Sequence, residues 1–383
     1  MDEGDKKSKP RKILIISGSI LLVLILVFAW LGFTRSGRRV IYKIAGRLIY
    51  QGLDKDDEIE ENSVIIPYDK ATTGKDKNKA DAKEKDTSID EQQPFEEVVV
   101  PRIKPEARKE DYVSNFLLFG IEEIFNAKNA DTIMIASVNT KDSTIKLTSL
   151  LRDSYIDVEG YNPNKLNAFF SLGGAKTFVH VIEDKYRIKI DGYAYINFES
   201  FEKIIDYLGG IAIELGEKEA DYLNNNNYIS NPANRNVIPG WNDLNGNQAL
   251  GYCRIRLVET MGGANDDYGR TLRQRRVIKA VFNKYKSKGL LDLLRISKNI
   301  LGYVKTNVTQ EQIEKTLEDI IENKITKMET MRLPVNGAYE APTKYLGIGY
   351  PLVYDWDENI IQLYQFIYLD TREEAESNLE KYK

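Results

Sequence analysis

Residues 131–151 read DTIMIASVNTKDSTIKLTSLL. Two runs rich in β-forming residues lie on either side of a short segment, residues 139–142, that contains asparagine and aspartate. Such a pattern is typical of two strands joined by a tight turn, because Asn and Asp side chains stabilise turns through local hydrogen bonds. The stretch therefore predicts a β-hairpin near the start of a folded domain that begins at about residue 111.

Other apolar runs on both sides of this hairpin predict further strands and helices. Short β-rich runs predict strands at 115–121, 211–215 and 331–335. Longer amphipathic segments predict helices at 173–186, 198–208, 290–304, 309–325 and 358–369. The pair Gly209-Gly210 is a helix stop signal. Strands interleaved with helices favour an α/β fold, with helices against a β-sheet, over residues 111–383.

The composition limits the chemistry of this domain. The chain has 383 residues, a formal net charge of −4, one cysteine (Cys253) and one histidine (His180). A single cysteine excludes an internal disulfide and a cysteine-based zinc site, and a single histidine excludes a metal site built from several histidines. His180 lies in an amphipathic helical segment, which favours a packed or surface position. The acidic balance gives no support to nucleic-acid binding.

The N-terminal part of the chain differs in composition from the rest. Residues 13–33 carry no charged side chain. This uncharged run is long enough to span a bilayer as a helix. They lack the cleavage motif of a signal peptide, so we expect an uncleaved transmembrane anchor after a short segment at 1–12, with a signal peptide as the alternative. Basic residues flank the run almost equally, which leaves its orientation open. Residues 34–110 are expected to form a juxtamembrane segment and a charged, flexible tether.

Residues 251–276, GYCRIRLVETMGGANDDYGRTLRQRR, hold six arginines. We expect residues 252–258 to form a strand, in which a period of two places Arg254 and Arg256 on one face. The other face is apolar and would point to a core. The arginine face then lies either in solvent or in a cleft.

A helix is expected to begin near residue 267, and its arginines fall on different faces. Steps of three and four back from the apolar stripe place three polar residues on the core-facing side: Arg270, Arg273 and Gln274. Arg275 and Arg276 fall on outer faces as ordinary surface charges. Inward-facing arginines at the start of a helix oppose the helix dipole, which indicates a bound anion. Guanidinium groups suit bidentate contact with phosphate.

Two aspartates are candidates for the same site. Asp131 begins a predicted strand, and Asp153 follows Arg152 just after another. The ends of strands are common places for sites in α/β folds. A carboxylate among arginines can neutralise them, hold a metal ion or accept a proton, and the residues alone leave these roles open.

Six segments resemble, in order, the blocks of the LytR-CpsA-Psr family. They are NFLLFGI (115–121), ADTIMIASVNTKDSTIKLTSLLRDSYI (130–156), NKLNAFFSLGG (164–174), FEKIIDYLGGIAIEL (201–215), LNGNQALGYCRIR (244–256) and DDYGRTLRQRRVIKAV (266–281). The resemblance covers about residues 112–285, and the ordered set is far more specific than any single block. It implies a central mixed β-sheet flanked by helices. Members of this family transfer a glycopolymer from a polyprenyl-pyrophosphate carrier to peptidoglycan as a phosphodiester, which implies an extracellular catalytic domain.

The resemblance also implies roles for individual residues. It assigns catalysis to Asp131, Arg152, Asp153, Arg254 and Arg256, and it assigns Mg²⁺ binding to Asp131 and Glu122. It assigns pyrophosphate binding to Arg152, Arg254, Arg256, Arg270, Arg273 and Gln274, together with a Lys-x-Asn element formed by Lys165 and Asn167. The chain departs from the family pattern at three places: Leu151 replaces a proline, Asn129 replaces an arginine, and Glu122 or Glu123 replaces an aspartate.

These features together predict a membrane-anchored, Mg²⁺-dependent phosphotransferase. Its N-terminus would be cytoplasmic, and its partners would be the lipid-linked glycan, peptidoglycan and the bilayer, with no nucleic acid. The alternatives are a pyrophosphatase that acts on the same lipid and a non-catalytic lipid-binding or regulatory membrane protein. The general base is Asp131 or Asp153. A groove for the lipid is expected between the sheet and residues 168–182, although core packing explains the same apolar stripe equally well.

Overall fold

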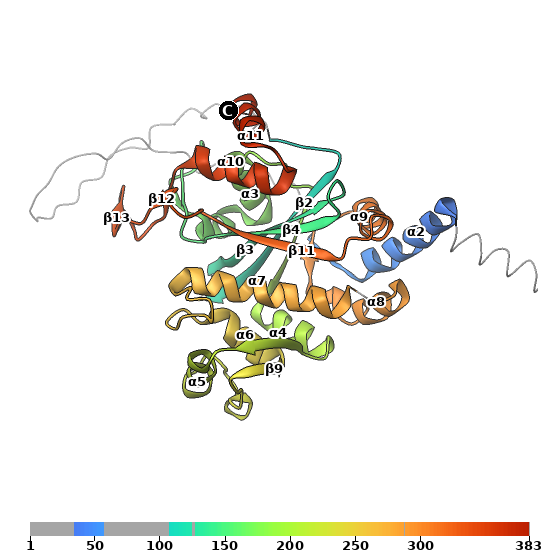
Figure 1. Ribbon diagram of the computed structural model, residues 1–383, viewed down its shortest axis with the longest axis horizontal. Helices are drawn as coiled ribbons and strands as arrows, with labels where there is room; N and C mark the ends of the chain where they lie inside the picture. The colour runs from blue at the N-terminus through green and yellow to red at the C-terminus, as the bar shows by residue number, and fades with distance from the viewer. Residues whose placement is uncertain (1–33, 57–106, 125–126, 287, 383) are drawn as a thin grey trace, which may run out of the picture.

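The computed structural model describes residues 34–56, 107–124, 127–286 and 288–382. A seven-stranded sheet lies between two layers of helices (Figure 1). Its strand order is β1-β10-β7-β2-β3-β4-β11, and it contains parallel and antiparallel pairs, which confirms the α/β fold with a central mixed sheet. The strands are β1 (Asp54–Lys55), β2 (Val113–Ile124), β3 (Ala127–Asn139), β4 (Thr144–Leu150), β7 (Gly192–Asn197), β10 (Lys305–Thr306) and β11 (Lys327–Leu333).

The predicted hairpin lies within this sheet, between the central strand β2 and the edge strand β11. β3 and β4 pair antiparallel, with Met134 opposite Ser149 and Asn139 opposite Thr144. The Asn139 side chain accepts hydrogen bonds from the backbone N–H groups of Lys141 (2.8 Å) and Asp142 (3.2 Å), and these bonds stabilise the turn. The strands are long and apolar because helices cover both of their faces.

One face of the sheet is covered by α3 (Phe169–Tyr186), α10 (Trp356–Tyr368) and α11 (Arg372–Lys381) (Figure 1). Phe169, Phe178 and Val181 of α3 are fully buried in the main hydrophobic core, together with Phe119 of β2. Most apolar side chains of residues 168–182 therefore pack into the core, which favours core packing over the lipid groove expected beside this stripe. The sequence could not separate the two possibilities, because apolar residues have the same helical spacing whether they face a core or a binding groove.

The opposite face is covered by α4 (Phe198–Tyr207), α6 (Gly246–Arg254) and α7 (Asp266–Tyr285) (Figure 1). Gly209 and Gly210, both with φ of +72°, follow the end of α4, as their sequence predicted. The predicted strand at 211–215 is β8 (Ile211–Leu215), which pairs with β9 (Gly240–Leu244) outside the central sheet. This small sheet, α5 (Glu217–Asn225) and the helices share a second hydrophobic core.

Shorter elements complete the described part of the chain. The predicted helix at 290–304 is divided into α8 (Leu290–Ser297) and a 3₁₀ turn, η3 (Leu301–Tyr303), and α9 (Gln310–Glu322) follows as expected. The other short elements are β5 (Tyr155–Ile156), β6 (Asn164–Lys165), β12 (Tyr339–Glu340), β13 (Lys344–Tyr345), β14 (Ile348–Gly349), β15 (Val353–Tyr354), η1 (Leu166–Ala168) and η2 (Pro232–Asn234).

The range 34–110, expected to be a juxtamembrane segment and a tether, contains an ordered helix at its start. α2 (Arg35–Gly52) packs against α9 and is followed by β1, which joins the edge of the sheet beside β10. Arg38 donates two hydrogen bonds to Glu322 of α9 (2.6 and 2.8 Å), which fixes the helix to the domain. The charge-rich composition of the range as a whole concealed this helix.

The expected anchor at 13–33 lies outside the described residues, as does most of the expected tether. Among the helices that the structure does describe, none is both long enough and apolar enough to cross a bilayer.

Replacing Gly246 with alanine should destabilise the domain, because a Cβ atom there would lie 2.1 Å from the backbone oxygen of Glu202 on α4. Overpacking of this kind costs about 1–3 kcal/mol, which should lower the midpoint of thermal unfolding by several degrees. Gly289→Ala is the matched control, since a Cβ atom there meets nothing within 4 Å. Equal unfolding temperatures for the two variants would contradict the close packing of α4 against α6.

Candidate functional site

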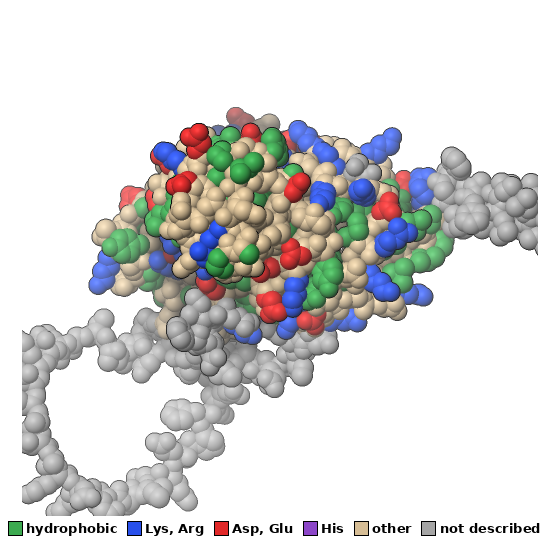
Figure 2. Space-filling model, turned by 90° about the horizontal axis from the view of Figure 1, so that it is seen from below, with side chains coloured by type: hydrophobic (Ala, Val, Ile, Leu, Met, Phe, Trp, Pro, Cys, Tyr) green, Lys and Arg blue, Asp and Glu red, His purple; other side chains and the backbone are tan. Residues whose placement is uncertain are grey.

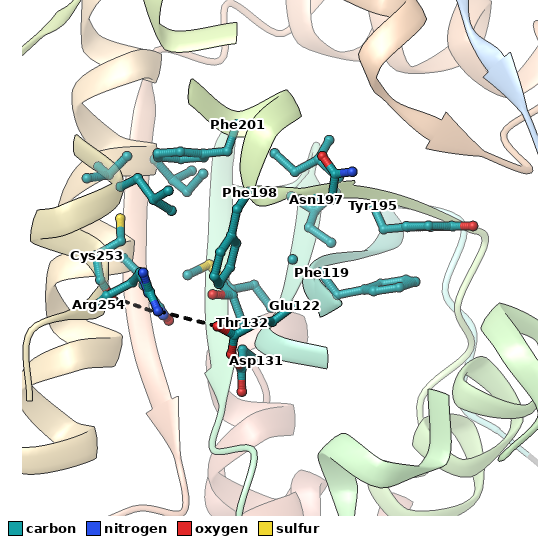
Figure 3. Close-up of a pocket in the computed structure, with 18 of the residues that line it drawn as sticks. Phe119, Glu122, Asp131, Thr132, Tyr195, Asn197, Phe198, Phe201, Cys253 and Arg254 are labelled. Atoms are coloured by element: carbon teal, nitrogen blue, oxygen red, sulfur yellow. Dashed lines mark hydrogen bonds and ion pairs between the residues drawn. The ribbon is translucent and has the colours of Figure 1, made fainter. Parts of the chain in front are cut away.

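A pocket of about 400 Å³ lies between the sheet and the helices α4, α6 and α7 (Figure 3). Its polar end is lined by Glu122, Asp131, Arg152, Arg254, Arg256, Arg270 and Gln274. The rest of its wall is mainly apolar and includes Leu118, Met134, Ala194, Ile196, Phe198, Phe201, Ile204, Leu250, Cys253, Val277, Ile278 and Val304. One continuous space therefore joins a cluster of charges to an apolar cavity.

A β-bulge brings the two carboxyl groups of the polar end together. Thr132 of β3 pairs with Gly120 of β2, whereas Ala130 pairs with Ile121, so Asp131 is the extra residue in the ladder. Bulges redirect side chains and are common beside functional sites. As a result Asp131 comes close enough to Glu122 for their carboxyl groups to share a hydrogen bond.

The two carboxyl groups have different proton affinities. Burial and then the hydrogen bond and charge of Asp131 raise the pKa of Glu122 from its ordinary 4.5 to about 7. Burial alone would raise the pKa of Asp131, but the hydrogen bond with Glu122 and the charge of Arg152 outweigh it, and this pKa lies below its ordinary value. Near neutral pH, Asp131 is therefore ionised while Glu122 holds a proton for part of the time.

Four arginines surround these carboxyl groups. Arg152 contacts Asp131 directly, and Arg254 reaches from α6 to Glu122, with 3.3 Å between Nη2 and Oε1 (Figure 3). The other two share Asp267 of α7: Arg270 Nη2 lies 2.8 Å from Oδ2, and Arg256 Nε lies 3.2 Å from Oδ1. Asp153 lies further from Arg152, with 3.7 Å between Oδ2 and Nε, so the four guanidinium groups face four carboxyl groups, of which Glu122 is partly protonated.

Two of these arginines retain unused hydrogen-bond donors. Within the described residues, Nε of Arg152 and Nε of Arg270 are buried and have no hydrogen-bond acceptor. Arg270 is almost fully buried, and that burial lowers the pKa of its guanidinium. A buried donor without an acceptor is costly, so this end of the pocket is suited to an anionic ligand.

The predicted strand at 252–258 was wrong, although both of its arginines do line the pocket. Residues 246–254 form α6, which begins with a capping box in which Asn245 and Gln248 bond to each other's backbone N–H groups. Arg254 is the last residue of α6, and Arg256 follows in an irregular segment. The short period-two pattern was misleading because it coincides with the last turn of a helix.

Arg273 does not line the pocket, contrary to its predicted role. Its side chain is 0% exposed and is paired with the equally buried Glu219 of α5, with 2.7 Å between Nε and Oε1. Its remaining nitrogens donate to the backbone oxygens of Ile255 (3.1 Å) and Val258 (2.7 Å). Arg273 therefore supports the segment that carries Arg256, while its neighbour Gln274 does line the pocket.

Arg275 and Arg276 are not the ordinary surface charges that the helical phase predicted. Arg275 is buried, and burial together with the nearby Arg332 lowers its pKa to about 10. Arg276 donates to the Tyr252 hydroxyl and to the backbone oxygen of Glu214, both at 2.6 Å. α7 lies between the central sheet and the small β8–β9 unit, so most of its circumference is packed. Arg275 is therefore buried and Arg276 is partly buried.

Asp153, Lys165 and Asn167 lie just outside the pocket wall. Lys165 Nζ is 2.8 Å from Asp153 Oδ1, and Asp153 Oδ2 is 3.7 Å from Arg152 Nε. The backbone N–H of Asn167 donates to the backbone oxygen of Arg152 (3.1 Å). These three residues brace Arg152 in the structure.

The aromatic and aliphatic wall of the pocket was not predicted. Phe198 and Phe201 enter it from α4, and Cys253 lies beside Arg254 (Figure 3). Burial raises the pKa of the Cys253 thiol to about 12. The amphipathic pattern of α4 was visible in the sequence, but an apolar stripe does not reveal whether it faces a core or a cavity.

Among the described residues, no group of three or more His, Cys, Asp or Glu side chains is arranged to hold a metal ion. Asp131 and Glu122 are therefore a pair of carboxyl groups and not a complete cage.

Comparison with known proteins places the chain in a family. A sequence model of the LytR_cpsA_psr family matches residues 68–355. The chain belongs to the LytR-CpsA-Psr family. Biofilm regulatory protein A of Streptococcus mutans is 34% identical to this LytR-CpsA-Psr chain over 201 residues, which are 49% of the chain and 45% of that relative. The match thus spans less than half of that relative's length.

A second relative has a more specific name. The polyisoprenyl-teichoic acid–peptidoglycan teichoic acid transferase TagU of Bacillus mycoides is 30% identical over 233 residues, which are 58% of the chain and 69% of TagU. The fold is also similar to that of TagT bound to LIIa-WTA (TM-score 0.53, 20% identity, covering 70% of this chain and 96% of TagT). The fold of TagV of B. subtilis is similar as well, with a TM-score of 0.51 and 22% identity, and the match covers 68% of this chain and 99% of TagV. At these identities the solved structures support the fold alone.

Replacing Glu122 with glutamine should remove a pH dependence of stability. Because the pKa of Glu122 rises from 4.5 to about 7 on folding, the folded protein binds more protons than the unfolded chain between these values. Wild-type stability should therefore fall as pH rises through this window and level off above it. Thermal unfolding across the window, with Glu373→Gln of the exposed face of α11 as control, measures the effect. A Glu122→Gln curve parallel to that of the wild type would contradict the raised pKa.

Proposed function

We propose that this protein transfers a glycopolymer from a polyprenyl-pyrophosphate carrier to peptidoglycan, forming a phosphodiester. The observation that carries the proposal is the pocket itself, in which four arginines stand at one end of an apolar cavity. A lipid pyrophosphate has the matching form, since a strongly anionic group is joined to a long hydrocarbon chain. The transferase name of the relative TagU supports the same reaction class.

The donor would bind with its pyrophosphate at the polar end. Nε of Arg152 and Nε of Arg270 would supply donors that are unused within the described structure, and Arg254 and Arg256 are exposed enough to contact phosphate oxygens. The first isoprene units would lie among Phe198, the other apolar residues of α4, and the sheet. This arrangement separates charge from hydrocarbon in the way that the ligand does.

Asp131 and Glu122 would hold Mg²⁺ together with the donor. Mg²⁺ keeps several waters and is commonly bound by one or two carboxylates and substrate phosphates, so a pair of carboxyl groups fits it without a third protein ligand. The raised pKa of Glu122 supports this fit, because two carboxyl groups this close favour a shared proton or a cation. When bound, the ion would neutralise charge on the phosphate oxygens.

The acceptor would be a sugar hydroxyl of peptidoglycan. Its oxygen would form a bond to the phosphorus that carries the glycan, and the bond from that phosphorus to the bridging oxygen would break, which releases polyprenyl phosphate. Asp131 would accept the hydroxyl proton, because it lines the pocket and Asp153 is turned toward Lys165. The arginines would balance the charge that develops on the leaving phosphate.

The reaction would take place at the outer face of the cell membrane, with residues 13–33 as the anchor. The test of the whole proposal is transfer of labelled glycan from its lipid carrier to peptidoglycan fragments by the full chain. Release of the label only as a free phosphorylated glycan would instead identify a pyrophosphatase, and binding without turnover would identify a lipid-binding protein.

Single replacements of Arg254, Arg256 and Arg270 by alanine should each weaken donor binding. Loss of one charge-assisted contact costs about 1.5–3 kcal/mol, which corresponds to roughly a tenfold to hundredfold rise in Kd. Binding of a polyprenyl-pyrophosphate analogue measures this, and Arg295→Ala on the exposed side of α8 is the matched control. If Arg295→Ala weakened binding as much as Arg270→Ala, the anion would not be bound at this end of the pocket.

Replacing Asp131 with asparagine should abolish transfer while the donor analogue still binds. The substitution keeps the shape of the side chain but removes the negative charge needed for Mg²⁺ and for the proton. Removal of Mg²⁺ with a chelator should stop wild-type transfer, and added Mg²⁺ should restore it. Transfer that continued unchanged in the variant or in excess chelator would contradict the roles of Asp131 and of the ion, respectively.

A further inference from the structure

The exposed side of α2 carries two parallel rows of side chains. Residues four apart lie one above another on a helix. One row is apolar and consists of Val40, Ile44 and Leu48, which are 38%, 57% and 52% exposed. The other row, one position earlier, is basic and consists of Arg35, Arg39, Lys43 and Arg47. At the end of the molecule where α2 lies, Figure 2 shows hydrophobic and basic side chains beside one another.

The opposite side of α2 is fixed to the domain, so the direction of both rows is set. Tyr42 and Ala45 are buried, and the Tyr42 hydroxyl donates to Glu322 of α9 (2.8 Å). Gly46 lies so close to α9 that a Cβ atom there would be 2.5 Å from Cγ of Glu314. The exposed rows are therefore a rigid surface of the folded domain.

The charge of this surface is one-sided. The sequence of α2 contains no acidic residue. Arg39 lies 3.0 Å and Arg35 lies 3.6 Å from Glu318 of α9. Across the described part of the chain, Lys43 and Arg47 have no ion-pair partner, so the far half of the basic row keeps its full charge.

We propose that α2 lies flat on an anionic lipid bilayer, with the apolar row in the headgroup region and the basic row against lipid phosphates. An apolar row beside a basic one is the pattern of helices that bind in the membrane interface. A second copy of the chain fits less well, because two such faces brought together would oppose their basic rows. The apolar run at 13–33, which is the anchor in the proposed function, ends in the sequence directly before Thr34, the N-cap of α2, and would keep the helix near the bilayer surface.

This contact would also orient the pocket. Gly52, at the end of α2, packs against Leu301 of η3, and Val304 just after η3 lines the apolar part of the pocket. The apolar end of the pocket therefore lies on the α2 side of the molecule. This consequence rests on the proposed function. The membrane contact shares with that function only the anchor at 13–33 and is otherwise argued from the two rows of α2.

The contact can be tested on the full chain reconstituted in vesicles of phosphatidylcholine and phosphatidylglycerol. Val40, Ile44 and Leu48 are replaced one at a time by cysteine and labelled with a fluorophore, and quenching by aqueous iodide is measured. Ser377→Cys on the exposed side of α11 is the water-accessible control, and the wild-type chain, whose single Cys253 is buried, gives the background. A flat helix predicts that quenching is lost equally at all three positions.

The alternatives give different patterns. A helix that stands upright would carry Leu48 about 12 Å further from the bilayer surface than Val40. Iodide quenching would then increase from position 40 to position 48, and this result would overturn the proposal. Control-level quenching at all three positions would overturn it as well. Lys43→Glu with Arg47→Glu should restore quenching at position 48, whereas Lys176→Glu on α3 should not. Because no glycan is present, the result is independent of transfer activity.

Discussion

The buried ion pair between Arg273 and Glu219 fixes the geometry on which the site depends. Neither side chain contacts solvent, and Arg273 also holds the carbonyl groups of Ile255 and Val258. The segment after α6 is thereby fixed to α7, and this segment carries Arg256 into the pocket. Breaking one partner of a buried pair leaves an uncompensated charge, so this contact is far more sensitive to substitution than the exposed ion pairs of α11.

The polar end of the pocket is organised before any ligand arrives. Asp267 holds Arg256 and Arg270, while Asp131 and Glu122 hold Arg152 and Arg254. These pairs keep like charges close together without fully neutralising them. An anion that enters therefore meets donors already in position, and little energy is spent in rearranging them. The β-bulge at Asp131 is the backbone feature that makes this arrangement possible.

Much of the fold was predictable because it rests on local patterns. The hairpin of β3 and β4, the end of α4 and the helices α9 and α10 follow directly from period, turn residues and helix stop signals. Arg254, Arg256 and Arg270 line one pocket, as expected of side chains that share a ligand, and their binding role stays a prediction. The failures share a cause, since period alone does not show what a face meets. Arg275 is buried in the interior, and Arg273 pairs with Glu219 instead of lining the pocket. Residues 252–258 are too short a run for their pattern to distinguish the end of a helix from a strand.

The single cysteine determines how the protein would respond to an oxidising environment. Cys253 is buried in the apolar wall of the pocket, and its thiol has a pKa of about 12. Oxidation and disulfide exchange proceed through the thiolate, which is therefore almost absent at neutral pH. The chain has no second cysteine with which to form an internal disulfide. A protein built this way tolerates an oxidising environment without depending on it, and its folding requires no thiol chemistry.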